Sequence, residues 1–136
     1  DGAVLDTRGR KRRLAEFTRG RVTLLTFMYS SCNDPGGCPY AFLVLHRVKE
    51  ALEALPPARE RVRLVSLSFD PRHDTPAVMA LYAGENAGDR RSVPWEFLTT
   101  GSDAQLLPIL DGYGQDLWRV VQGVGGPGAG RFTHVL

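Results

Sequence analysis

The only two cysteines of the 136-residue chain, Cys32 and Cys38, lie in one short segment, TFMYSSCNDPGGCPYAF. Two thiols at this spacing can form a disulfide, exchange with other thiols or hold a soft metal ion. The intervening NDPGG contains two glycines, which accept backbone angles that other residues avoid, so the loop can fold back. A purely structural disulfide is a third interpretation, and closing so short a loop would stabilise the fold by about 2 kcal/mol.

The elements on either side of this loop place both thiols where chemistry often occurs. Residues 21–29, RVTLLTFMY, are almost wholly apolar and predict a strand that is buried on both faces. Cys32 follows the C-terminal end of that strand, at the edge of a sheet where ligands collect. Cys38 occupies the expected N-cap of a helix that starts at Pro39, so we expect the helix dipole to favour its thiolate.

Helices and strands then alternate along the chain. Apolar residues between Ala41 and Leu55 recur at helical spacing, and Pro56-Pro57 ends that predicted helix. The segment 61–69, RVRLVSLSF, predicts a second buried strand. A strand, a helix and another strand in this order imply a parallel sheet.

The later part of the chain continues the alternation. Thr75 is the predicted cap of a short helix that ends at Gly84. A strand over 95–99 and a helix from about residue 103, bent or ended near Pro108, are expected to follow. The final RFTHVL alternates like the beginning of a strand.

Two segments resemble ligand-binding motifs but have simpler interpretations. LDTRGRKRRL predicts a hairpin with its tip at Arg8-Gly9 and a basic exposed face, and no interleaved aromatic residue suggests nucleic-acid binding. The glycine-rich residues 122–130 precede a strand instead of joining a strand to a helix. We therefore expect a flexible loop there and not a phosphate cradle.

Composition agrees with one domain spanning residues 1–136. With 17 basic and 15 acidic side chains, the chain has no strong field that would attract nucleic acid or an anionic membrane. Its apolar runs are far shorter than the roughly 20 residues of a membrane helix. The abrupt start, DGAVLDTRGR, is what would remain after an anchor or signal had been removed.

Three stretches together resemble the Sco/SenC family of copper chaperones. These are the cysteine motif LLTFMYSSCNDPGGCP, the segment VSLSFDPRHDTPAVMALYA and the segment WEFLTTGS. The resemblance extends over nearly the whole chain and implies an α/β, thioredoxin-like fold with a central mixed sheet flanked by helices. It also implies that further C-terminal elements of this fold lie beyond Leu136.

The resemblance implies a copper site and a cellular role. The family's metal ligands fall on Cys32, Cys38 and His134, and two thiolates with one imidazole suit copper as Cu(I) or Cu(II), although zinc is chemically compatible. The implied role is delivery of copper to the copper-site subunit of cytochrome c oxidase, or exchange with another copper or thiol donor protein. The family also implies a periplasmic or extracytoplasmic protein, tethered to a membrane through an anchor outside this chain.

One departure from the family keeps a second function open. The family motif has three residues between its cysteines, whereas this chain has the five residues NDPGG. A longer loop changes the angle between the sulfur atoms and favours a redox role. The alternative is therefore a thiol-disulfide oxidoreductase that uses Cys32 and Cys38 without metal. A third interpretation is a domain with a structural disulfide that recognises a protein partner.

Other residues that could bind metal are assigned to simpler roles. His46 and His73 have no partner residue that suggests ligation. Met28 and Met79 fit a core strand and the apolar face of a helix. Two carboxylates, Asp70 and Asp74, are expected to cap the helix that follows them or to orient groups around the site.

Overall fold

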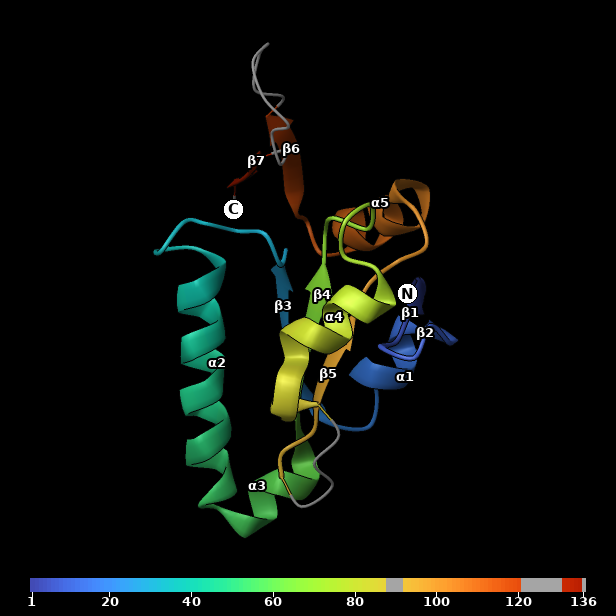
Figure 1. The fold of residues 1–136 in the computed structure, drawn as a ribbon. Helices are drawn as coiled ribbons and strands as arrows, with labels where there is room; N and C mark the ends of the chain where they lie inside the picture. Colours follow the sequence, from blue (N-terminus) through green and yellow to red (C-terminus); the bar gives the residue numbers. More distant parts are fainter. Residues whose placement is uncertain (88–91, 121–130, 136) are drawn as a thin grey trace.

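A parallel sheet of three strands, in the order β3-β4-β5, forms the centre of the computed structural model (Figure 1). The structure describes residues 1–87, 92–120 and 131–135, with side chains up to residue 116. Strand β3 (Val22–Met28) pairs with β4 (Val62–Ser68), and β4 pairs with β5 (Trp95–Leu98). These strands confirm the predicted order.

Helices connect the parallel strands and cover one face of the sheet. Helices α2 (Cys38–Glu53) and α3 (Pro56–Arg61) link β3 to β4, and α4 (Pro76–Ala83) with the 3-10 turn η1 (Gly84–Asn86) follows β4. The buried residues on this face form one core cluster: Met28, Leu45, Leu64, Met79, Ala83, Val93, Trp95 and Phe97. Both methionines are therefore core residues, as predicted.

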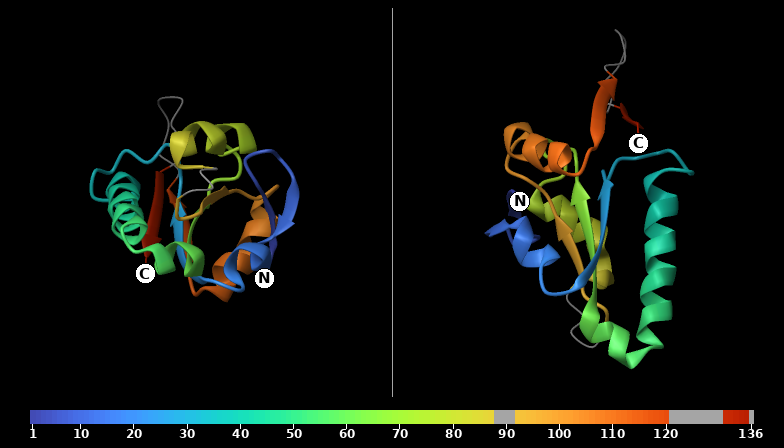
Figure 2. Two further views of the ribbon diagram at one scale, coloured as in Figure 1. Left: turned by 90° about the horizontal axis from the view of Figure 1, so that it is seen from below. Right: turned by 180° about the vertical axis from the view of Figure 1, so that it is seen from behind.

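The opposite face is covered by N-terminal elements and α5 (Asp103–Gly112). These N-terminal elements are the strands β1 (Ala3–Leu5) and β2 (Lys11–Arg13) and the helix α1 (Leu14–Thr18). A second core cluster lies here: Val4, Leu14, Phe17, Val65, Leu67, Leu98 and Ile109. Figure 2 shows the sheet between the two layers of an α/β fold. The middle strand β4 is largely buried, but β3 lies at the edge of the sheet, where Val22 is 65% and Leu24 is 40% exposed. The prediction that residues 21–29 form a strand buried on both faces was therefore wrong for the first half of β3.

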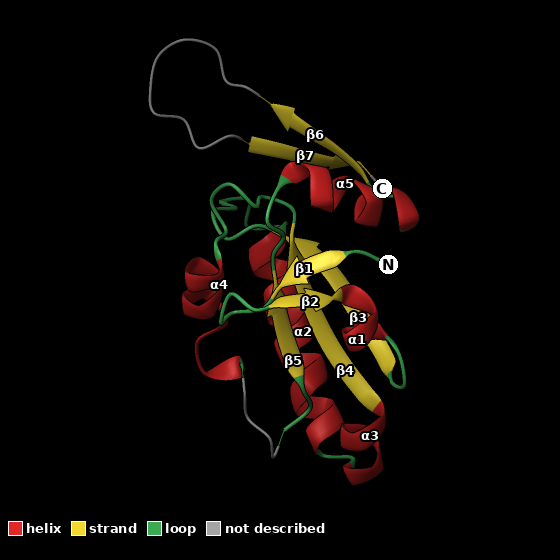
Figure 3. Ribbon diagram, turned by 90° about the vertical axis from the view of Figure 1, so that its right-hand side faces the viewer, coloured by secondary structure: helices red, strands yellow, loops and turns green. Residues whose placement is uncertain are grey.

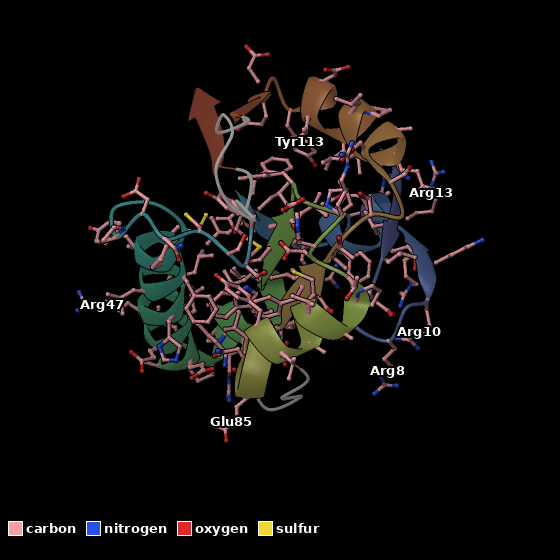
Figure 4. The ribbon with its side chains drawn as sticks, turned by 45° about the horizontal axis from the view of Figure 1, so that its top comes forward. Arg8, Arg10, Arg13, Arg47, Glu85 and Tyr113 are labelled. Carbon is pink, nitrogen blue, oxygen red and sulfur yellow. The ribbon has the colours of Figure 1, made fainter. Side chains whose placement is uncertain are left out.

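The N-terminal hairpin has the predicted antiparallel pairing, and Gly9 in its turn has φ 74°. Its arginines extend outward from the hairpin (Figure 4) and pair with carboxylates of the same region. Arg10 Nε lies 2.7 Å from Asp6 Oδ2, and Arg13 Nη2 lies 2.8 Å from Asp1 Oδ2. Internal pairing therefore engages part of the basic run 8–13.

The two predictions about prolines have different outcomes: Pro108 does not end its helix, whereas helix α2 does end before Pro56-Pro57. Helix α5 continues through Pro108 to Gly112, because Leu106, Ile109 and Leu110 are buried and their packing offsets the hydrogen bond that Pro108 cannot donate. Pro56 and Pro57 do follow the end of α2, but they also begin α3. Proline suits a first helical turn because its missing N–H would have no partner there.

A separate two-stranded sheet follows α5. Strand β6 (Asp116–Val120), which was not predicted, pairs antiparallel with β7 (Arg131–Val135), which was (Figure 3). In the described residues, antiparallel pairing is thus confined to hairpins and one bridge, Leu5 to Thr99, while the central strands are all parallel. The glycine-rich segment 122–130 lies outside the described residues. No helix in the described ranges is long and apolar enough to cross a membrane.

Candidate metal and thiol site

The structure brings Cys32 and Cys38 together at the C-terminal edge of the parallel sheet. Cys32 lies in the loop after β3, and its backbone N–H donates to the Tyr29 carbonyl over 3.3 Å. Cys38 is the first residue of α2 and not its N-cap, which is Gly37. Both cysteines are free and partly buried, and the Cys38 thiol donates a hydrogen bond to the Cys32 sulfur. The predicted juxtaposition of the two thiols is confirmed.

The two thiols differ in acidity, which the sequence did not predict. Burial opposes ionisation of Cys32, but backbone N–H groups of Cys38 and Asp34 and the Tyr29 hydroxyl donate to its sulfur and lower its pKa below the ordinary value. Burial and the adjacent Cys32 sulfur instead raise the pKa of Cys38 to about 11. The expectation of a helix-activated Cys38 was therefore wrong, because burial and the Cys32 sulfur outweigh the backbone hydrogen bonds that favour its thiolate.

Gly37 allows the loop to approach the Cys32 sulfur closely. A Cβ atom at position 37 would lie 3.3 Å from Cys32 Sγ and 3.3 Å from the Asp34 carbonyl oxygen. At Gly36, the nearest atom to such a Cβ would be Asp34 Oδ1 at 3.7 Å, an ordinary contact. Of these two loop glycines, only Gly37 is required for the close packing around the thiol.

A cavity of about 290 Å³ opens beside the thiols. Its lining includes three aromatic rings and comes from the β3 loop, α2 and α4: Tyr29, Ser30, Cys32, Cys38, Pro39, Phe42 and Tyr82. Burial and the charges of Cys38, Asp74 and Cys32 raise the pKa of Tyr82 to about 12, so its phenol stays protonated at neutral pH. The cavity thus presents two sulfur atoms and hydroxyl groups within an apolar wall, which suits a soft ion or a partner thiol.

The third predicted ligand, His134, lies in β7 opposite Leu117, and its side chain is outside the described side chains. Within the described ranges, no group of three histidine, cysteine, aspartate or glutamate side chains could hold a metal ion. His46 lies 3.6 Å from exposed Glu50. His73 Nδ1 lies 2.8 Å from Asp70 Oδ2. The structure gives neither histidine a place beside the thiols.

Sequence reasoning missed the aromatic part of the site. Tyr29 is the last residue of the predicted strand 21–29 and Ser30 follows it, and no role in the site was predicted for either. Phe42 and Tyr82 fall in two separate predicted helices. They meet only because α2 and α4 pack on the same face of the sheet, where their ring centroids lie 5.2 Å apart. The available signal for Tyr29 and Ser30 was their place at the carboxyl end of a parallel strand.

The fold and the thiol pair together define a thioredoxin-like domain with a reduced dithiol at the sheet edge. The SCO1/SenC family model matches residues 3–128. The chain therefore belongs to the SCO1/SenC family. The match ends before β7, and so it does not include His134.

Solved structures of the same fold agree with this assignment. Copper-bound ScoI of Bradyrhizobium japonicum is 25% identical with a TM-score of 0.75, over 98% of this chain and 76% of that one. Apo Sco1 of Thermus thermophilus is 30% identical with a TM-score of 0.73, over 98% and 70%. Copper-bound yeast Sco1, at 18% identity and a TM-score of 0.76 over 98% and 67%, shares the fold. No curated protein matches the chain.

Proposed function

We propose that this chain is a copper metallochaperone that delivers its cargo to the copper-site subunit of cytochrome c oxidase. The observation that carries the proposal is the pair of free thiols, joined by a hydrogen bond, beside one cavity at the edge of a Sco-type fold. Thiolate sulfur is a soft ligand that favours Cu(I) over harder divalent ions. Family membership and the copper-bound ScoI at 25% identity support copper as the cargo.

The proposed ligands are Cys32, Cys38 and His134. The two sulfur atoms are already adjacent, so copper uptake needs deprotonation of Cys38 and little movement of the loop. His134 would add an imidazole nitrogen from β7. An imidazole matters more for Cu(II) than for Cu(I), which is satisfied by two thiolates.

The second candidate function is thiol-disulfide exchange, which the difference in acidity between the thiols favours. The Cys32 thiolate would attack a disulfide of the partner, form a mixed disulfide and release one partner thiolate. Cys38, after losing its proton, would attack the Cys32 sulfur and release the second partner thiolate. Each cycle oxidises the two cysteines to a disulfide and reduces one partner disulfide, with two electrons transferred.

The proposed setting is extracytoplasmic, with the single domain 1–136 tethered to a membrane by a segment outside this chain. A structural neighbour from Bacillus anthracis, 20% identical, is described as a SCO1/SenC family lipoprotein. Fractionation of cells that express the full-length protein tests this setting. Recovery in the membrane fraction, with the domain accessible from outside the cytoplasm, is the expected result.

An anaerobic Cu(I) titration of the reduced chain against a competing chelator tests the copper proposal. We expect one copper ion per chain, and loss of tight binding in Cys32→Ser and in Cys38→Ser. His134→Ala should weaken Cu(II) binding more than Cu(I) binding, while His46→Ala, at a half-buried histidine of α2 that pairs with Glu50, serves as the matched control. Cu(I) binding that survives both cysteine substitutions would refute the site. Disulfide reduction without copper binding would favour the second candidate.

A further inference from the structure

A fully buried carboxylate, Asp74, lies beneath the loop that carries the first thiol. Its side chain accepts hydrogen bonds from the Ser30 backbone N–H over 3.0 Å, from the Ser30 hydroxyl and from the Ser68 hydroxyl. A buried carboxylate is costly unless it is paired or hydrogen-bonded. Three donors converge on Asp74, so its charge is compensated at the position where two strands end.

Helix capping does not account for this carboxylate. The N-cap of α4 is Thr75, whose hydroxyl accepts from the backbone N–H of Val78. Asp74, in the turn before α4, instead connects to the end of β4 through Ser68, six residues earlier, and to the loop after β3 through Ser30, 44 residues earlier. The Ser68 hydroxyl accepts from the Asp70 backbone N–H over 3.0 Å, so its own proton is directed to Asp74.

The connection reaches the dithiol through Ser30. Ser30 lines the cavity together with both cysteines and lies two residues before Cys32. The Cys32 backbone N–H donates to the Tyr29 carbonyl over 3.3 Å, so Ser30 and Cys32 belong to one hydrogen-bonded turn, 29–32. The Cys38 end is fixed separately by α2. The distance between the sulfur atoms therefore depends on how firmly Ser30 is held.

We propose that Asp74 is a positioning residue of the dithiol, which holds the Ser30 turn so that the Cys32 sulfur stays beside Cys38. Two bonds from Ser30 to one buried acceptor restrict the turn before any ligand arrives. A pre-positioned pair loses less conformational entropy on closing a disulfide or chelating a metal ion. The copper part of this inference rests on the proposed function, whereas the disulfide part does not.

The test measures the thiol-disulfide equilibrium of the chain with glutathione and, separately, its Cu(I) affinity. One glutathione disulfide oxidises the two cysteines to a disulfide and yields two glutathione thiols. In Asp74→Asn, which replaces one acceptor oxygen with a donor, we expect the equilibrium constant for disulfide formation to fall about tenfold. Cu(I) affinity should fall in the same direction. Ser30→Ala, which removes only the hydroxyl donor, should give about a threefold loss.

Glu53→Gln is the matched control, because Glu53 also accepts a serine hydroxyl hydrogen bond, from Ser92, at the far end of α2. That variant should lower the melting temperature while leaving both thiol measurements unchanged. If Asp74→Asn does not fold, the glutathione equilibrium of Ser30→Ala tests the proposal instead. Wild-type glutathione equilibria in folded Asp74→Asn, or in Ser30→Ala when Asp74→Asn does not fold, would overturn the proposal. A wild-type chain that binds no copper would refute the copper function. The glutathione equilibrium would still test whether Asp74 positions the dithiol.

Discussion

Alkylation of the reduced chain should distinguish the two cysteines sharply. The pKa of Cys32 is lowered and that of Cys38 is raised to about 11. At pH 8, a thiol with the latter pKa is about 0.1% ionised, compared with about 24% for an ordinary thiol of pKa near 8.5. The thiolate, and not the thiol, reacts with iodoacetamide. Limiting reagent should therefore modify Cys32 and leave Cys38 largely free.

The expected difference in rate can be worked out from these values. The ionised fraction makes Cys38 about 240-fold slower than an ordinary thiol, but a more basic thiolate is also more nucleophilic. With a Brønsted coefficient near 0.45, a pKa that is about 2.5 units higher makes the Cys38 thiolate about 13-fold more reactive than an ordinary thiolate. Cys38 should thus react about 20-fold more slowly than an ordinary thiol. Its partial burial slows the reaction further.

Peptide mass spectrometry after timed alkylation measures both rates in one sample. Cys32→Ser removes the neighbouring sulfur that contributes to the raised pKa of Cys38, whereas burial, the largest cause, remains. Cys38 should react faster in that variant than in the wild-type chain, yet still more slowly than a free thiol. Equal rates for the two cysteines, or faster modification of Cys38, would show that the assignment of the acidic thiol is wrong.

Three further outcomes follow from the contacts of single residues. Gly37→Ala, whose added Cβ would meet Cys32 Sγ at 3.3 Å, should slow diamide-driven disulfide formation several-fold, and Gly36→Ala should not. Burial opposes ionisation of Asp6, but hydrogen bonds from Arg10 and from the Arg8 backbone N–H lower its pKa overall. Asp6→Asn should therefore lower the free energy of unfolding by about 1–2 kcal/mol at pH 7. Because that stabilisation is present above the unfolded pKa and is lost as pH falls through the folded pKa, the difference should shrink in urea melts below about pH 4. Cu(I) affinity should rise about tenfold per pH unit between the two thiol pKa values, because binding releases one proton there, and a pH-independent affinity would contradict this.

The sheet and the thiol loop were predictable because their signals are local. Strand β4 has four branched apolar side chains among its seven residues, VRLVSLS, and no glycine or proline interrupts it, so a buried strand was the expected structure. Thr75, followed by Pro76, marks the start of α4 by its own chemistry. The juxtaposition of Cys32 and Cys38 followed from one glycine-containing loop at the end of a parallel strand.

The features that sequence reasoning missed depend on contacts between distant segments. The length of α5 is decided by the burial of Ile109 and its neighbours against the sheet and not by Pro108. The three bonds to Asp74 join segments up to 44 residues apart in sequence. The acidity of each thiol depends on its burial and on which donors meet its sulfur, and a helical pattern in the sequence shows neither.

The start of α2 at Cys38 explains why one dithiol suits both proposed activities. With Cys38 as the first helical residue, its backbone N–H donates to Cys32 while its own sulfur is buried under the helix. Between the pKa values of the two thiols, the cavity holds one negative charge, on Cys32, and not two repelling charges. A partner disulfide meets a single nucleophile, with the second thiol in place to resolve the mixed disulfide. A Cu(I) ion would bind first to the Cys32 thiolate. Its positive charge would then favour loss of the proton from Cys38, whose thiolate it also binds. The same protonation pattern therefore serves thiol-disulfide exchange and copper chelation. Which of the two occurs depends on whether the partner brings a disulfide or a Cu(I) ion.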